Sequence, residues 1–199
     1  MNIENTCLLL IGFQNEYFSP SGIFRDVIKE SDKENNVLVN TLELIEQLKE
    51  TRIPIVTTSI VFNEDYSELN DPVGILKTIM DTGAFKCGSY GGATIDELNK
   101  YGDRITEIPG KKGLNAFINT DLDRMLKERG VENIVLAGAV TSLCIDSTAR
   151  AAQELDYKVY VLSDCTAGKS TLEQDFYCKQ IFPLYAHVIN HTELIRMLN

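Results

Sequence analysis

The stretch VLAGAVTSLCIDSTARAA, residues 135–152, decides the fold that we expect for this chain. It begins as an apolar run typical of a buried strand, and Gly138 loosens the backbone where that run ends. Thr141 or Ser142 can cap a following helix, and Cys144 lies in the first turn of that helix. A strand followed by a helix in this way is the repeating unit of a parallel α/β sheet.

The same alternation of apolar runs and helical patterns covers most of the 199 residues. Strands are expected over Cys7–Phe13, Pro54–Phe62, Arg104–Ile108, Asn133–Gly138, Lys158–Ser163 and Ala186–Asn190, and helices over Glu34–Thr51, Asp121–Arg129, Ser142–Leu155, Thr171–Phe182 and Thr192–Leu198. Apolar strands separated by helices predict a sheet covered on both faces. We therefore expect an α/β fold in a single domain, with a doubly wound, mainly parallel six-stranded sheet. The stretch 63–101, rich in Gly, Asp and Ser, should cross the carboxyl edge of that sheet and wall a substrate pocket.

The composition of the chain limits the cellular compartments and the classes of binding partner that we expect. The net charge of −10 argues against nucleic acid or an anionic membrane surface as the main partner. No apolar run reaches the length of about 18 residues that a transmembrane helix needs, and the N-terminus lacks the basic region of a signal peptide. Five widely spaced cysteines with no CxxC pair fit free thiols in a reducing compartment. These features predict a cytoplasmic protein.

In such a sheet, ligands bind beyond the carboxyl ends of the strands, where the strand order reverses. With the order 3-2-1-4-5-6, that point lies between the first strand, which ends near Gly12, and the fourth, which leads to Cys144. Free N–H groups at a helix start favour a thiolate and can hold a developing oxyanion. Cys144 is therefore a candidate nucleophile. The alternative is a small hydrophobic residue packed at the helix start, and Cys165, after the fifth strand, could reach the same edge.

Five segments together resemble the isochorismatase-like cysteine hydrolases: LLLIGFQNEYF (8–18), GGATIDEL (91–98), GKKGLNAFINTDLDRML (110–126), VLAGAVTSLCIDSTARAA (135–152) and VYVLSDCTAG (159–168). Amide-cleaving members of that family use a cysteine nucleophile, a lysine and an aspartate as general base. The resemblance implies that Cys144 is the nucleophile and that a cis peptide joins Ala139 to Val140, just before Thr141. It further implies that the N–H groups of Val140 and Cys144 are oxyanion donors.

For the lysine, the family spacing implies Lys111, with the adjacent Lys112 as the competitor. The aspartate is where this chain departs, because Gly12 stands at the position of the general base. Glu16 lies four residues on, where the family has its second acidic residue. The general-base position is thus vacant, and glycine is expected to leave a space beside Cys144 that water or a substrate group could occupy.

Neither a metal nor another cofactor is expected. Family members that hold a metal carry an Asp/His cluster after the second strand, whereas the stretch 57–71 here has acids but no histidine. The two histidines, His187 and His191, fall near the C-terminus, and a strand there should lie at the far edge of the sheet. A Cys–His dyad would need one of them in the crevice beside Cys144.

Four aromatic residues fall in segments that should approach the pocket: Phe18, Phe62, Tyr90 and Phe117. They would suit a small, partly apolar substrate, and the alternative for each is ordinary core or subunit packing. The resemblance also implies a homodimer or homotetramer.

Three functions remain open at the level of sequence. The first is hydrolysis of the C–N bond of a small amide through a thioester on Cys144, with Lys111 in support. The second is a catalytically degenerate protein that binds a small molecule or acts as a scaffold. The third is hydrolysis of a vinyl ether without a covalent intermediate, which would also lack its aspartate here.

Overall fold

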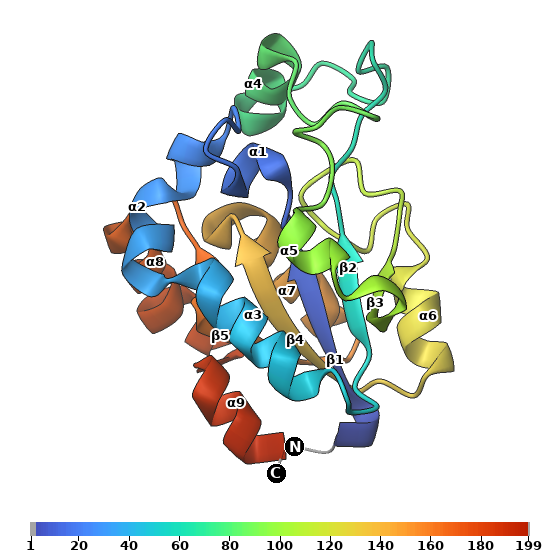
Figure 1. The fold of residues 1–199 in the computed structure, drawn as a ribbon, viewed down its shortest axis with the longest axis vertical. Helices are drawn as coiled ribbons and strands as arrows, with labels where there is room; N and C mark the ends of the chain where they lie inside the picture. Colours follow the sequence, from blue (N-terminus) through green and yellow to red (C-terminus); the bar gives the residue numbers. More distant parts are fainter. Residues whose placement is uncertain (1–2, 199) are drawn as a thin grey trace.

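The computed structural model describes residues 3–198 and contains one six-stranded, all-parallel sheet (Figure 1). The strands are β1 (Thr6–Ile11), β2 (Ile55–Thr58), β3 (Ile105–Glu107), β4 (Asn133–Ala139), β5 (Lys158–Ala167) and β6 (His187–Ile189). Their order is β3-β2-β1-β4-β5-β6, so the expected order and fold class are confirmed. The strand order reverses between β1 and β4, and Ile11 lies opposite Gly138 where those two strands end.

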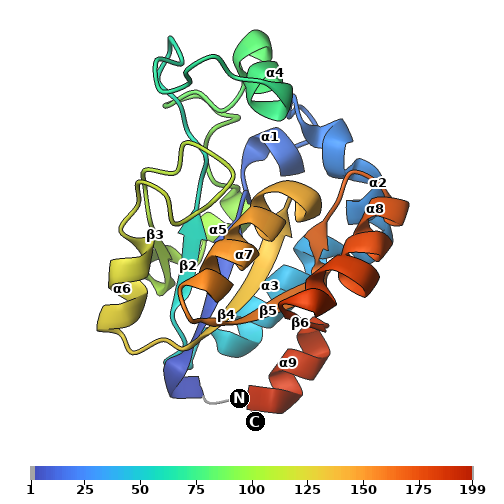
Figure 2. The same cartoon turned by 180° about the vertical axis from the view of Figure 1, so that it is seen from behind.

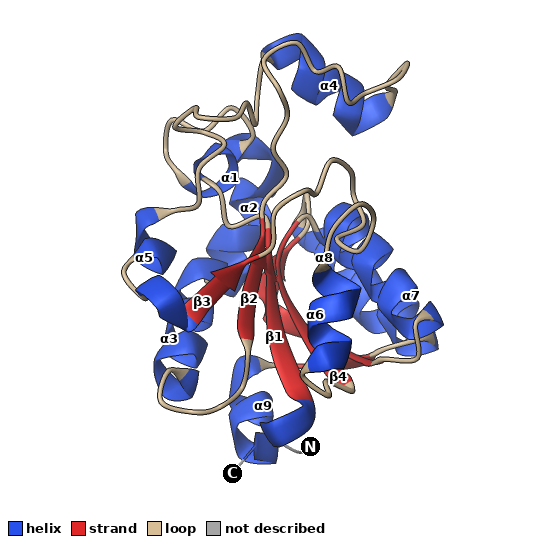
Figure 3. Cartoon of the chain, turned by 90° about the vertical axis from the view of Figure 1, so that its right-hand side faces the viewer, coloured by secondary structure: helices blue, strands red, loops and turns tan. Residues whose placement is uncertain are grey.

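Helices cover both faces of the sheet. One face carries α2 (Arg25–Asn35), α3 (Val37–Leu48) and α9 (His191–Leu198), which lie in front of the sheet in Figure 1. The other face carries α6 (Leu122–Glu128) and α7 (Asp146–Glu154), which lie in front in the opposite view (Figure 2). Figure 3 shows the sheet edge-on as the middle layer.

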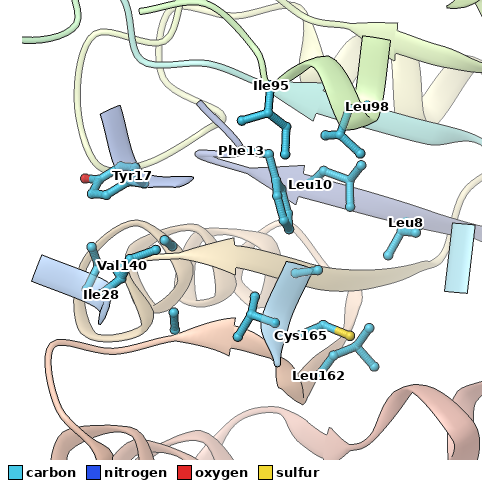
Figure 4. Close-up of a cluster of buried hydrophobic side chains, with 14 of the residues drawn as sticks. Leu8, Leu10, Phe13, Tyr17, Ile28, Ile95, Leu98, Val140, Leu162 and Cys165 are labelled. Carbon is cyan, nitrogen blue, oxygen red and sulfur yellow. The ribbon is translucent and has the colours of Figure 1, made fainter. Parts of the chain in front are cut away.

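The alternation of side chains along β1 divides the core into two apolar layers. Leu8 and Leu10 pack with the α2, α3 and α9 side, while Cys7, Leu9 and Ile11 pack with the α6 and α7 side. Figure 4 shows part of the first layer, where Leu10 lies near Leu98 and Leu162 lies near Cys165. Because every residue of β1 is buried, its run of apolar residues is continuous rather than alternating.

Several element boundaries differ from the expectation. The helix expected over Glu34–Thr51 is α3, which begins only at Val37 because Asn36 adopts a left-handed conformation (φ 52°). Helix α2, which ends at Asn35, was not predicted from the sequence. The strand expected to reach Phe62 ends at Thr58, after which Phe62 forms an isolated bridge with Lys86. The fifth strand runs past Ser163 to Ala167.

The stretch 63–101 does cross the carboxyl edge, and it contains helices that the sequence did not predict. Helix α4 (Gly74–Thr82) lies beyond the carboxyl ends of the strands (Figures 1 and 3), and α5 (Asp96–Asn99) follows it. Further short helical segments are η1 (Ile3–Asn5), α1 (Asn15–Phe18), η2 (Gly102–Arg104), η3 (Thr141–Ile145), α8 (Thr171–Phe176), η4 (Tyr177–Ile181) and η5 (Phe182–Leu184). Among residues 3–198, no helix is long and apolar enough to cross a membrane.

Candidate active site

Cys144 and Lys111 face each other at the carboxyl edge of the sheet. The Lys111 Nζ lies 3.5 Å from the Cys144 Sγ and 2.6 Å from the carbonyl oxygen of Gly113. Both side chains are buried, Lys111 to 1% exposure and Cys144 to 5%. A buried ammonium needs partners that carry negative charge or accept hydrogen bonds. Here the Cys144 sulfur is one of its two partners, and the Gly113 carbonyl is the other.

The neighbouring Lys112 points elsewhere. Its ammonium donates to the Val61 carbonyl and forms an ion pair with Glu68 at 2.9 Å. Lys112 also lines a cavity of about 330 Å³ with Gly113, Asn115 and Ser147, but Cys144 is not part of that lining. Of the two adjacent lysines, the structure therefore brings Lys111 to the cysteine.

Cys144 lies in a π-helical turn, η3, that leads into α7. The peptide bond between Ala139 and Val140 is cis, at the position the resemblance implies. The N–H groups of Leu143 and Ile145 both donate to the Val140 carbonyl, at 3.0 and 3.2 Å. These two amides are therefore engaged within the turn, and the oxyanion role of the Val140 and Cys144 amides stays a prediction.

The approach of β4 to the end of β1 depends on Gly138. Its φ is +125°, and a Cβ at this position would lie 1.8 Å from the carbonyl oxygen of Ile11. A residue with a side chain would force the two strands apart. Gly138 thus allows the turn that carries Cys144 to lie directly against the end of β1.

Gly12 does not leave an open space, contrary to our expectation. Its φ is +73°, and a Cβ built on it would lie 2.8 Å from the Ala139 carbonyl oxygen and 3.6 Å from the Tyr17 Cε2. A contact of 2.8 Å between a Cβ and a backbone oxygen requires one of them to move. The backbone at the end of β4 therefore crowds the position where a side chain of residue 12 would begin, and the Tyr17 ring lies at ordinary contact distance from it.

Sequence reasoning missed Tyr17 as a residue of the site. It is 3% exposed, and its ring packs against Phe85 and Phe24 with centroid distances of 5.2 and 6.0 Å. Burial raises the pKa of Tyr17 well above its ordinary value, and negative charge at Cys144 and then at Glu16 raises it further. The signal was its place in LLLIGFQNEYF, one helical turn beyond Gly12.

Gln14 and Glu16 hold the backbone around the site. The Gln14 amide donates to the carbonyls of Ile60 (2.9 Å) and Gly92 (2.7 Å) and accepts from the Ile60 N–H (3.0 Å). The Glu16 carboxylate accepts from the N–H groups of Ile23 (2.8 Å) and Phe85 (3.3 Å). Both carboxylate oxygens of Glu16 are thus engaged by the backbone of other segments.

Thr141 and Thr58 are two buried hydroxyls at this edge. Thr141 donates to the Gln174 side chain at 2.6 Å, which ties the turn of Cys144 to α8. Thr58 lies opposite Ile11 in the sheet, and its Oγ1 has no hydrogen-bond partner among the described residues. Such an atom can bind a polar group of a ligand.

The four aromatic residues expected at one pocket lie apart. Phe18 and Tyr90 line a small cavity of about 130 Å³ beside α1 and α5. Phe62 is fully buried against Tyr66, and Phe117 stacks on Tyr157 beside the start of β5. Each packs where its own segment meets the core, so the expectation of a shared aromatic wall is not met.

The histidines and Cys165 also lie away from Cys144. His187 stacks on Tyr160, and His191 pairs with Asp164 at 2.6 Å. Cys165 packs in the layer of α3 and α9, where burial raises the pKa of its thiol. Asp164, Cys165 and His191 are the one group of three potential metal ligands within 4.8 Å in the described part of the chain. Asp164 and His191 already form a hydrogen bond with each other. The expectation of no metal remains a prediction.

Comparison with known proteins identifies the family of this chain. Residues 6–193 match the family model of the isochorismatase domain. The chain is 25% identical over 178 residues to the ureidoacrylate amidohydrolase RutB of Azorhizobium caulinodans, covering 82% of this chain and 77% of that protein. It is similar in structure to a cysteine hydrolase from Pseudomonas syringae pv. phaseolicola, with a TM-score of 0.87, 20% identity and coverage of 98% and 93%. For N-carbamoylsarcosine amidase from Thermoplasma acidophilum, the TM-score is 0.72, with 20% identity and coverage of 94% and 96%. Because the family model spans nearly all of the sequence, the chain belongs to the isochorismatase family of hydrolases.

Proposed function

We propose that this protein is a cysteine hydrolase that cleaves the C–N bond of a small amide or ureido compound. The Cys144 thiolate attacks the carbonyl carbon, an amine leaves, and water hydrolyses the resulting thioester. The observation that carries the proposal is the buried contact of 3.5 Å between the Lys111 ammonium and the Cys144 sulfur. A nucleophile paired with a buried cation is the arrangement that catalysis by a thiolate needs.

Two features support this chemistry. An ammonium has three N–H donors, and Lys111 uses two of them on the Gly113 carbonyl and the Cys144 sulfur. The third can bind a substrate oxygen as negative charge develops on it. The substrate class is supported by the similarity to proteins named ureidoacrylate amidohydrolase and N-carbamoylsarcosine amidase.

The first experiment measures the reactivity of the thiols. Iodoacetamide labelling between pH 5 and 9, mapped by peptide mass spectrometry, should show Cys144 reacting faster near neutral pH than the exposed Cys87. Lys111→Met should slow the labelling of Cys144 and leave that of Cys87 unchanged, since only Cys144 contacts the ammonium.

The second experiment measures turnover. In a screen of small amides and N-carbamoyl compounds, Cys144→Ala should lower kcat/KM at least about 10³-fold while the fold is retained. Cys178→Ala is the matched control, because Cys178 lies on the segment after α8 and does not contact Lys111. Cys144 labelling no faster than that of Cys87, together with binding but no turnover, would instead support the catalytically degenerate alternative.

A further inference from the structure

Amide hydrolysis through a thioester needs a proton donor at the leaving nitrogen. An amine leaves readily only when its nitrogen is protonated as the C–N bond breaks, and a positioned donor typically contributes about 10²- to 10⁴-fold in rate. Gly12 has no side chain that could donate a proton, and the Glu16 carboxylate accepts hydrogen bonds from two backbone N–H groups. Two groups at this edge carry a transferable proton: the Lys111 ammonium, 3.5 Å from the Cys144 sulfur, and the Tyr17 phenol, whose ring lies 3.6 Å from the Cβ position of Gly12.

The position of Tyr17 suits a proton donor to the leaving nitrogen. The ring atom that lies 3.6 Å from the Cβ position of Gly12 is Cε2, which is bonded to the carbon that bears the hydroxyl. The ring is held in place by Phe24 and Phe85. Figure 4 shows the hydroxyl directed away from the labelled apolar side chains, beyond the end of β1. Among residues 3–198, no side chain or carbonyl forms a hydrogen bond with it.

The electrostatics determine which way the proton can move. Because burial and the charge at Cys144 both raise the pKa of Tyr17, its phenol stays protonated throughout the neutral range. A protonated phenol can donate, and it cannot act first as a base.

We propose that the Tyr17 hydroxyl is the proton donor to the leaving nitrogen, in the place where a residue-12 side chain would otherwise act. This role rests on the proposed function. In the first step, the S–C bond forms, the C–N bond breaks, and the phenol proton passes to the nitrogen, so that a neutral amine leaves and a phenolate remains. In the second step, water attacks the thioester carbonyl and gives a proton to the phenolate. The S–C bond then breaks, which restores both the phenol and the thiolate.

Lys111 is less suited to this task. Its ammonium already donates to the Gly113 carbonyl at 2.6 Å and to the Cys144 sulfur. Loss of its proton would leave a neutral amine beside the sulfur and remove the charge that stabilises the thiolate. The structure thus separates the two roles: Lys111 holds the charge, and Tyr17 supplies the proton.

The test compares two leaving groups on one acyl group. p-Nitrophenolate leaves from p-nitrophenyl acetate without a proton, whereas the nitrogen of p-nitroacetanilide needs one. Tyr17→Phe should lower kcat/KM for the anilide by about 10²- to 10⁴-fold and for the ester by less than about 3-fold. Iodoacetamide labelling of Cys144 and the melting temperature should change little, because the lost hydroxyl makes no hydrogen bond within the described residues.

Tyr66→Phe is the matched control. Tyr66 is also buried, but its hydroxyl donates to the Ala84 carbonyl at 2.7 Å, and the variant should leave the anilide-to-ester ratio unchanged. Equal losses on both substrates, no loss on the anilide, or a parent protein that cleaves the ester but not the anilide would overturn the role of Tyr17. A parent protein with neither esterase activity nor rapid labelling of Cys144 would overturn the proposed function itself, and the role of Tyr17 with it.

Discussion

At the scale of single residues, the packing around position 12 favours glycine, and glycine leaves no empty space there. The Gly12 backbone is left-handed, and the Ala139 oxygen lies 2.8 Å from its Cβ position, so a side chain there would be strained and would force a shift of the neighbouring backbone. The backbone at the end of β4 crowds this position, and the ring of Tyr17 lies at ordinary contact distance from it. The packing at residue 12 and the placement of Tyr17 thus form one arrangement.

This arrangement predicts a loss of stability in Gly12→Ala. The left-handed backbone alone costs a residue with a Cβ about 1–2 kcal/mol, and the contact with the Ala139 oxygen adds to that cost. Gly88→Ala is the matched control, since Gly88 has the same φ of +73° and nothing within 4 Å of its Cβ position. Urea unfolding should show a larger loss for Gly12→Ala than for Gly88→Ala. Equal losses would mean that the turn yields to a side chain without cost.

The structure also predicts the outcome for Gly12→Asp. The longer side chain starts from the same crowded Cβ position, so it should destabilise the protein and should not raise amide hydrolysis above that of the parent. Kinetics on the folded variant would check this, and a gain in activity would show that the site can still accept a carboxylate at residue 12.

At the scale of elements, the carboxyl edge is held by side chains that bind backbone of other segments. Gln14 joins the end of β1 to the exit of β2 at Ile60 and to the 91–95 segment at Gly92. The backbone continues this contact, because Glu16 donates to the Gly91 carbonyl and Ile95 to the Phe13 carbonyl, at 2.9 and 3.1 Å. Tyr17 is held in place by these contacts with segments far away in the sequence.

Gln14→Ala should therefore be strongly destabilising. It leaves three backbone groups without partners in a fully buried position, and each such group costs about 1–3 kcal/mol. The free energy of unfolding in urea should fall by about 3 kcal/mol or more. Gln47→Ala, at an exposed position of α3, should change it by less than about 0.5 kcal/mol. A small effect at Gln14 would mean that water replaces the three hydrogen bonds.

At the scale of the whole molecule, two apolar layers enclose thiols that resist ionisation. Burial raises the pKa of Cys7 to about 12 and that of Cys178 to about 12. In the unfolded chain a thiol loses its proton near pH 8.5, whereas in the folded protein these two keep theirs. Since the folded state binds the proton more tightly, the stability contributed by each thiol is fully present below about pH 8.5 and decreases as pH rises toward 12.

The free energy of unfolding should thus decrease above about pH 8.5, by about 1.4 kcal/mol per pH unit for a fully buried thiol such as Cys7. Urea unfolding under reducing conditions between pH 7 and 10 measures this slope. Cys7→Ala should reduce the slope by that amount, whereas Cys87→Ala, at an exposed position, should leave it unchanged. An equal slope in the parent and in Cys7→Ala would contradict the prediction.

The sequence by itself determined the sheet and the position of Cys144. Continuous apolar runs separated by helical patterns predict a parallel sheet, because local periodicity reflects which faces are buried, and the turn after β4 carries Cys144 whatever else surrounds it. Only the tertiary structure decided what lies around that sulfur. Whether Gly12 leaves a space, whether Tyr17 fills it and whether Phe117 reaches the site all depend on close approaches between segments far apart in sequence. No local pattern encodes those distances, since they follow from how the assembled layers pack.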